Sequence, residues 1–327
     1  MTSTLLKMSH ISKSYPGVNA VDDVSIDLYA GEVLGLMGEN GAGKSTLIKL
    51  LAGAEKIDSG EIYIDEKKVD INSPKTSQEN GVSVIHQELI TMDTLSVAEN
   101  IFVGQLPVNK VTKLIDWKTA QKKSTEALAL LNSEINPKSI VASLSIYEKQ
   151  IVEVAKAIHK NAKIVVMDEP TAALSEKDSK ALFAVIKSLK KQGVGIIYIS
   201  HRIEEVFNIS DRITVMRDGE FIGTKLTKGT EQKEIISMMI GRELNQFFPE
   251  IKSEKKGVMM KVSDLNINGI IENISFEVKK GEILGLFGLV GSGCLNIARA
   301  LIGVEDIDQG EFHINDKKTS IKIQKML

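Results

Sequence analysis

Residues 38–46 read Gly38-Glu39-Asn40-Gly41-Ala42-Gly43-Lys44-Ser45-Thr46. The stretch follows the apolar run Val33–Met37 and precedes a second apolar run, Leu47–Leu51, so it predicts a strand, a glycine-rich loop and a helix. Three glycines let the backbone turn tightly and aim successive N–H groups inward, and the helix adds its positive N-terminal end. Lys44 is placed to reach the outer phosphates of a nucleotide, and the Ser45 hydroxyl to bind magnesium. The stretch therefore predicts a phosphate-binding loop.

The composition is that of an ordinary globular protein, with 43% hydrophobic and 26% charged residues in a chain of 327. The 41 Lys and Arg residues nearly balance 43 Asp and Glu residues, so the net charge of −2 gives no overall attraction to nucleic acid or to an anionic membrane surface, which leaves only local patches. Cys294 is the single cysteine, which excludes an internal disulfide and a cysteine metal cluster. Apolar runs such as Ile283–Val290 are shorter than the ~18–20 residues that cross a bilayer, and the amino terminus lacks a signal-peptide pattern.

The chain contains an internal repeat. The segment Gly281–Gly288 restates Gly31–Gly38 at an offset of 250 residues (281 minus 31), and the match continues without a gap. This repeat predicts a first domain over 1–247, a charged linker at 248–257, and the beginning of a second copy at 258–327. Because the repeat requires many more residues than this second part contains, we expect the chain to be a fragment or a truncated product.

The second copy of the loop differs from the first where the chemistry is concentrated. Cys294–Asn296 replaces Lys44–Thr46, although the glycines are kept. The loop therefore lacks the lysine contact and the hydroxyl that binds magnesium, and we expect poor or absent hydrolysis there.

A pair of carboxylates follows the apolar run Ile164–Met167. Such a run predicts a buried parallel strand, whose carboxyl end lies at the nucleotide crevice. Asp168 is then expected to orient the magnesium shell, and Glu169 to act as the general base or to position the attacking water. Alone, an acidic pair of this kind is more often the start of a solvated loop.

Two more apolar runs end in polar side chains. Gly195–Ser200 precedes His201, which is a candidate γ-phosphate sensor or, alternatively, a structural histidine. Val82–Ile85 precedes Gln87, which either contacts magnesium or the attacking water or is a strand-end amide that faces solvent.

The remaining segments of the first domain have simpler patterns. Leu5–Tyr29 alternates apolar and polar residues around a turn, which predicts an antiparallel strand pair with Tyr15 near its tip. The Tyr15 ring either stacks on an adenine base or packs within the hairpin. Residues 94–157 are predicted to be mostly helical, and Ser145 stands where a helix N-cap is expected.

Together, and in this order, these segments resemble the nucleotide-binding domain of ABC ATPases. The motifs that carry the resemblance are an adenine platform, the phosphate loop, a strand-end glutamine, a signature sequence, the acidic pair and a switch histidine: Tyr15, Gly38–Thr46, Gln87, Leu144–Ser145, Asp168–Glu169 and His201. The resemblance implies an α/β P-loop NTPase fold with an antiparallel β subdomain and a helical subdomain at about 94–157, followed by the start of a second copy.

The resemblance also implies ligands and roles. ATP is bound by Tyr15 and residues 38–46, Mg²⁺ is held by Ser45, Gln87 and Asp168, and catalysis uses Glu169, His201 and Gln87. Ser145 becomes a γ-phosphate contact made across a dimer interface, onto nucleotide held by an opposing domain. The glycine expected after Leu144–Ser145–Ile146 is Tyr147, which departs from the family pattern.

More narrowly, the chain resembles the duplicated ATP-binding subunits of bacterial importers for ribose or galactosides. The features in common are two nucleotide-binding domains in tandem and the sequence segments Met167–Leu174, Tyr198–Arg202, Arg217–Gly219 and Gly288–Gly291. This resemblance implies ATP hydrolysis that powers sugar import, at the cytoplasmic face of the membrane. It further implies permease subunits, an extracytoplasmic substrate-binding protein and a second nucleotide-binding domain as partners, and no nucleic acid. The alternatives are a soluble tandem ABC ATPase that acts on ribosomes or nucleic acid and a non-transporting truncated fragment.

Overall fold

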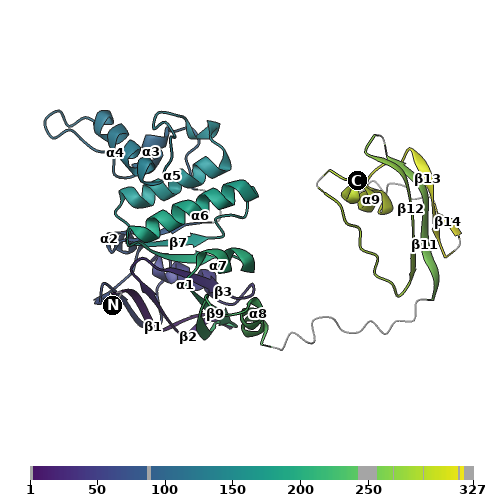
Figure 1. The fold of residues 1–327 in the computed structure, drawn as a ribbon, viewed down its shortest axis with the longest axis horizontal. Coiled ribbons are helices and arrows are strands. Elements are labelled where there is room, and N and C mark those ends of the chain that lie inside the picture. The colour runs from purple at the N-terminus through teal and green to yellow at the C-terminus, as the bar shows by residue number, and fades with distance from the viewer. Residues whose placement is uncertain are drawn as a thin grey trace. The chain divides into compact units, whose positions relative to one another are not determined.

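The computed structural model describes residues 3–86, 90–241, 256–267, 269–289, 291–315 and 317–319. The chain divides into two compact units, Met1–Asn245 (unit 1) and Gln246–Leu327 (unit 2) (Figure 1). Most of the expected linker 248–257 lies outside the described residues, which resume at Lys256 with the first strand of unit 2. Among the described helices, none combines the length and the apolar character that crossing a membrane requires.

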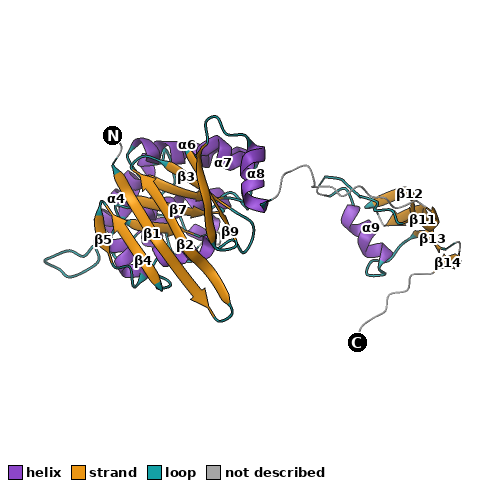
Figure 2. Cartoon of the chain, turned by 90° about the horizontal axis from the view of Figure 1, so that it is seen from below, coloured by secondary structure: helices purple, strands orange, loops and turns teal. Residues whose placement is uncertain are grey.

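Unit 1 is built on one sheet of ten strands within its described residues. Its strand order is β5-β4-β1-β2-β10-β9-β3-β8-β7-β6, in which β5, β4, β1 and β2 are antiparallel, and β9, β3, β8, β7 and β6 are parallel (Figure 2). The strands are β1 (Thr4–Tyr15), β2 (Val18–Tyr29), β3 (Val33–Met37), β4 (Ser59–Ile64), β5 (Lys67–Val69), β6 (Val82–Ile85), β7 (Ile164–Asp168), β8 (Gly195–Ile199), β9 (Arg212–Arg217) and β10 (Glu220–Leu226).

The helices of unit 1 lie on both faces of the parallel strands (Figure 1). They are α1 (Lys44–Leu51), α2 (Pro74–Glu79), α3 (Val97–Ile101), α4 (Trp117–Leu130), α5 (Ile146–His159), α6 (Glu176–Lys191), α7 (Ile203–Ile209) and α8 (Gln232–Ile240), with a 3-10 turn η1 (Val141–Ser143). The segment 94–157, expected to be mostly helical, contains α3, α4, η1 and all of α5 except its last two residues. The connection between α3 and α4 contains no regular helix among these described residues.

The central strands are buried on both faces, which explains their near-continuous apolar sequences. Along β3, Val33 and Met37 pack into one core cluster, and Leu34 and Leu36 pack into a second. The first cluster joins the parallel strands to α3–α6, and the second joins them to α1 and the antiparallel strands. Because side chains alternate along a strand, five residues are enough to tie the two layers together.

Unit 2 repeats the beginning of unit 1. It contains β11 (Lys256–Ile267), β12 (Ile271–Lys280), α9 (Cys294–Leu301), β13 (Gln309–Ile314) and β14 (Lys317–Thr319), with the sheet order β12-β11-β13-β14. The order matches β2-β1-β4-β5, and α9, β13 and β14 begin and end 250 residues after α1, β4 and β5. The repeat found in the sequence is therefore also a structural repeat.

One segment of unit 2 differs from its counterpart. Gly281–Gly288 corresponds to the segment that contains β3, yet the described residues 282–289 form no strand. Their apolar side chains are exposed, with Ile283 at 87% and Phe287 at 97%. In unit 1, β3 is flanked by β8 and β9, and the described part of unit 2 holds no counterpart of either strand. Without neighbours, the apolar pattern alone does not make a strand.

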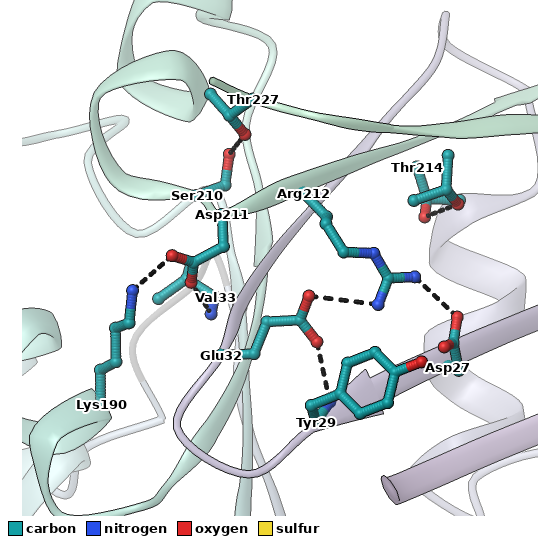
Figure 3. Close-up of polar contacts among 11 residues, drawn as sticks. Asp27, Tyr29, Glu32, Val33, Lys190, Ser210, Asp211, Arg212, Thr214 and Thr227 are labelled. Carbon is teal, nitrogen blue, oxygen red and sulfur yellow. Dashed lines mark hydrogen bonds and ion pairs between the residues drawn. The ribbon is translucent and has the colours of Figure 1, made fainter. Parts of the chain in front are cut away.

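Ion pairs connect the antiparallel strand β2 of unit 1 with the beginning of its strand β9 (Figure 3). Arg212, at the beginning of β9, donates to Asp27 of β2 (Nη2 to Oδ1, 2.7 Å) and to Glu32 (Nη1 to Oε1, 3.2 Å). Glu32 also accepts the backbone N–H of Tyr29 at 2.8 Å. The Glu32 side chain is only 8% exposed, and its burial raises its pKa against the opposing effect of Arg212. Arg212 is thus the cation that compensates a buried carboxylate.

The Arg212→Met substitution is expected to lower the free energy of unfolding of unit 1 by about 3 kcal/mol, because it leaves a buried charge without its partner. The measurement is urea unfolding followed by the fluorescence of Trp117, the single tryptophan of the chain. Lys190→Met is the matched control, because its pair with Asp211 is 34% and 40% exposed and is expected to contribute less than about 1 kcal/mol. Equal losses in the two variants would contradict this account of Arg212.

Candidate functional site

The glycine-rich loop between β3 and α1 is shaped by backbone contacts that exclude side chains. Gly43 has φ 94°, and a Cβ there would lie 2.4 Å from the carbonyl oxygen of Ala20. A Cβ on Gly38 would lie 2.3 Å from the carbonyl oxygen of Met216 in β9. The loop is therefore packed closely between the backbone at Ala20 and the backbone at Met216, with no room for side chains at these glycines. It continues directly into the N-terminus of α1, where backbone N–H groups are free to bind an anion.

Lys44, the first residue of α1, folds back over this loop. Its Nζ donates to the carbonyl oxygens of Gly38 at 2.8 Å and Glu39 at 2.9 Å. Burial lowers the pKa of Lys44, and the nearby carboxylates of Asp168 and Glu169 oppose that shift. A cation held in this way lies over the loop that is expected to hold phosphates.

A cavity of about 330 Å³ brings the loop and the acidic strand end together. It is lined by residues 40–46 of the loop, by Asp168 and Glu169 at the end of β7, and by Val18, Ala20 and Ile199. Strand β8 lies between β3 and β7 in the sheet, so these groups meet because parallel strands end at one edge. Seven residues of the predicted phosphate loop and both predicted carboxylates thus share one cavity.

Glu169 is held in an unusual backbone conformation. Its φ is 46°, in the left-handed region, and its N–H donates to the carbonyl oxygen of Ile199 in β8 at 2.9 Å. The carboxylate Oε2 lies 3.2 Å from Nδ1 of His201, the residue that follows the end of β8 by two positions. The backbone bond to β8 fixes Glu169 in the cavity lining, and His201, which lines a separate cavity, contacts it from the neighbouring strand.

The residues at the cavity suit a magnesium ion. Ser45 and Asp168 both line it and offer the oxygen ligands that Mg²⁺ prefers, usually one or two from protein together with substrate phosphates. Burial, followed by the neighbouring Glu169 charge, raises the pKa of Asp168. A divalent cation would relieve this repulsion between adjacent carboxylates. Gln87, the third predicted ligand, lies outside the described residues.

The two other predicted contacts lie apart from the cavity lining in the described structure. Tyr15 ends β1 with 37% of its surface exposed, and the Lys13 ammonium lies 5.6 Å from its ring centroid. Ser145 is the N-cap of α5, and its Oγ accepts the N–H of Glu148 at 3.3 Å in a capping box. The Ser145 residue is exposed, while Tyr147 is half-buried against the first core cluster. The contacts of Tyr15 and Ser145 with nucleotide stay predictions.

A buried carboxylate behind the site escaped the sequence analysis. Glu205 of α7 is 9% exposed, and its Oε2 accepts the hydroxyls of Thr171 at 2.6 Å, Tyr198 at 3.0 Å and Ser200 at 3.2 Å. Its Oε1 accepts Nη1 of Arg202 at 3.1 Å. Thr171 follows Glu169 by two positions, and Ser200 and Arg202 flank His201. Glu205 therefore ties together the two chain segments that carry Glu169 and His201.

Glu205→Gln is expected to lower the rate of the nucleotide hydrolysis that the sequence predicts about tenfold. It is also expected to lower the free energy of unfolding by about 2 kcal/mol, because an amide lacks the negative charge that four hydrogen-bond donors share. The adjacent Glu204→Gln is the matched control, because Glu204 is exposed. Turnover and urea unfolding are measured on both variants. A Glu205→Gln protein that is less stable but fully active would leave Glu205 with a structural role alone.

Two glycines of the unit 2 loop keep the backbone conformation of their counterparts in unit 1. Gly291 and Gly293 have φ values of 89° and 85°, against 88° and 94° for Gly41 and Gly43. Cys294 stands at the position of Lys44 and accepts a hydrogen bond from the Ser292 hydroxyl at 3.4 Å. The glycine geometry is thus retained without the lysine.

Comparison with known proteins gives a family match. The model of the ABC transporter family matches residues 21–172 and 271–327 of this chain. The ribose import ATP-binding protein RbsA of Clostridium tetani is 44% identical over 316 residues, covering 97% of this chain and 63% of that protein. The galactose/methyl galactoside import ATP-binding protein MglA 1 of Photobacterium profundum is 43% identical, covering 98% of this chain and 65% of that protein. The chain thus spans less than two thirds of the length of these curated relatives.

Solved structures of similar fold are ATP-binding cassettes. The ADP conformation of MJ1267, an ATP-binding cassette of an ABC transporter, matches with a TM-score of 0.65 and 27% identity, over 74% of this chain and 100% of that one. A nucleotide-free ATP-binding cassette from an ABC transporter matches with a TM-score of 0.63 and 25% identity, over 76% of this chain and all of that one. These matches confirm the predicted α/β P-loop fold with its antiparallel β part.

Proposed function

The chain belongs to the ABC transporter family, and on this basis we propose that it binds and hydrolyses ATP to power the import of ribose, a galactoside or a related small sugar. The observation that carries the proposal is the shared cavity, in which Lys44, Ser45, Asp168 and Glu169 meet. The sugar class is supported by the 43–44% identity to ribose and galactoside import ATP-binding proteins.

The proposed reaction uses groups that line the shared cavity or contact its lining. The N–H groups of the loop and the Lys44 ammonium hold the phosphates. The Glu169 carboxylate accepts a proton from a water whose oxygen bonds to the γ-phosphorus, while the bond from that phosphorus to the bridging oxygen breaks. His201, 3.2 Å from Glu169, orients that carboxylate and contacts the γ-phosphate. Ser45 and Asp168 would hold Mg²⁺, which when bound neutralises charge on the phosphates.

A second nucleotide-binding domain completes the proposed site. The exposed Ser145 hydroxyl at the N-terminus of α5 would contact the γ-phosphate of nucleotide held by an opposing domain, where the helix N-terminus also favours the negative charge. The half-buried Tyr147 occupies the position where the family has glycine, so the contact falls to Ser145 and the backbone beside it.

Membrane permease subunits and an extracytoplasmic substrate-binding protein are the proposed partners, and the cytoplasmic face of the membrane is the proposed location. We assign the permease contact to the helical segment 94–157. A cavity of about 270 Å³ lies between its α5 and the elements α1, α2 and β6, lined by Glu153, Lys156 and Ser77 among others.

Proteoliposomes test the importer proposal directly. Vesicles containing a ribose or a galactoside permease enclose the chain and ATP, and the matching sugar-loaded binding protein is added outside. Wild-type chain is expected to drive uptake of labelled sugar, and the Lys44→Ala chain is not. Tight MgATP binding with no uptake through either permease would contradict the importer assignment while leaving nucleotide binding intact.

A further inference from the structure

The connection between α3 and α4 is an ordered hairpin (residues 103–116). Val108 and Ile115 form a bridge, the N–H of Asn109 donates to the carbonyl oxygen of Leu114 at 2.9 Å, and the N–H of Asp116 donates to that of Pro107 at 2.8 Å. Its tip is closed by the Asn109 side chain, which accepts two backbone N–H groups. In Figures 1 and 2 it projects away from the helices of unit 1.

The hairpin exposes large apolar side chains that the hydrophobic core of unit 1 does not use. Val111 at the tip is 90% exposed and Leu114 is 69% exposed. Val108, Ile115 and Trp117, at the start of α4, are 53%, 41% and 42% exposed. Five such exposed apolar side chains thus lie within ten residues, and exposed apolar groups gathered in this way mark an interaction surface.

Lysines neighbour these apolar residues in the sequence. Between positions 99 and 126 the chain has five lysines and three acids, Glu99, Asp116 and Glu126, although its overall net charge is −2. The lysines are all exposed: Lys110, Lys113, Lys118, Lys122 and Lys123. Asp116 caps α4 through Thr119, accepting its N–H at 3.0 Å and its hydroxyl at 2.7 Å. The hairpin therefore presents apolar groups and cations together, with its one carboxylate engaged.

We propose that this hairpin contacts an anionic lipid bilayer, with Val111 and Leu114 inserted among the headgroups and the lysines on the lipid phosphates. Exposed aliphatic side chains, a tryptophan and lysines in one segment are the composition of segments that lie at membrane interfaces. A projecting hairpin suits a fluid surface, whereas a protein partner would have to supply a matching groove. In Figure 1 the hairpin projects on the same side of unit 1 as α2, which lines one cavity together with α5 of the helical segment 94–157.

This inference rests on the proposed function, which brings the chain to a membrane. Charge complementarity favours lipid over a neutral surface, because each lysine near an anionic leaflet strengthens binding several-fold and salt screens that attraction. The hairpin would then orient the subunit against the bilayer beside its permease.

Trp117 makes the test specific. It is the single tryptophan of the chain and lies at the base of the hairpin, so its emission reports on this contact and not on the exposed apolar segment of unit 2. Vesicles of phosphatidylcholine, with and without phosphatidylglycerol, are titrated into the full chain. We expect a blue shift and quenching by brominated lipid only with phosphatidylglycerol, and weakening by salt.

Variants separate the two components of the contact. Val111→Ser with Leu114→Ser, and separately Lys110→Gln with Lys113→Gln, are each expected to weaken vesicle binding about tenfold. Leu226→Ser in β10 is the control, because Leu226 is 65% exposed far from the hairpin in sequence, and it should bind as wild type. Unchanged Trp117 emission, or equal binding by all variants, overturns the proposal. The chain could instead bind detergent-solubilised permease without lipid, in a way that requires Val111 and Leu114. That result would overturn the lipid proposal in favour of a protein interface.

MgATP binding, measured on the same samples, keeps the two proposals apart. Normal nucleotide binding and sugar uptake with no lipid response defeats the hairpin proposal alone. A lipid response in a chain that binds no MgATP defeats the proposed function and leaves the hairpin contact standing.

Discussion

Replacing Glu169 with glutamine is expected to lower MgATP turnover about 100-fold or more, with nucleotide binding unchanged. The amide keeps the size of the side chain but cannot accept a proton from the attacking water. Because the backbone of Glu169 is fixed by its N–H bond to Ile199, the substitution should leave the loop geometry in place. The loss should therefore appear in the chemical step alone.

Single-turnover kinetics and nucleotide titration on the same samples separate these effects. Glu176→Gln serves as the matched control, because Glu176 lies seven positions further on with a side chain 85% exposed. Turnover by Glu169→Gln equal to that of the control would remove the assignment of Glu169 as the base.

Lys44→Ala is expected to weaken MgATP binding about 10- to 100-fold, the range for losing a charge-assisted hydrogen bond to phosphate. The ammonium already lies over the loop, 2.8 Å and 2.9 Å from two of its carbonyl oxygens, so little reorganisation is needed to meet a phosphate. Its removal also leaves Asp168 and Glu169 with less positive charge nearby, which further disfavours an anionic ligand.

Fluorescent-nucleotide titration measures the loss. Lys49→Ala is the matched control on the same helix, since Lys49 is exposed and lies outside the lining of the phosphate-loop cavity. Equal affinity in the Lys44→Ala and Lys49→Ala variants would show that nucleotide does not bind at this loop.

Much of the fold was predictable because its signals are local. The apolar runs of β3, β7 and β8 indicate strands buried on both faces, and the loop spacing places a helix after β3. Parallel strands end at one edge, which predicts that Asp168 and Glu169 lie near the loop. The 250-residue offset likewise predicts α9 from α1.

The rest depended on neighbours that no local pattern specifies. Glu204 and Glu205 look alike in sequence, and only the packing of α7 shows that Glu205 is the buried acceptor. Ser145 reads equally as a cap and as a phosphate contact, and the structure shows the cap. The hairpin lies inside a segment expected to be mostly helical, because that expectation rests on the helical spacing within 118–131 and 151–158, whereas the hairpin depends on its own bridge.

The exposed segment at 282–289 has a consequence for the order of folding. In unit 1 the corresponding strand, β3, pairs Val33 with Ile196 of β8, which lies 163 residues later in the chain. Strand β3 can therefore pair only after β8 has been synthesised, whereas β1 and β2 are neighbours in the sequence and can pair at once. During synthesis each copy would therefore form its antiparallel sheet first. The stretch that corresponds to β3 would meanwhile stay unpaired, although its sequence favours a strand. That interval is when self-association competes most with folding, and shielding by a chaperone should matter most.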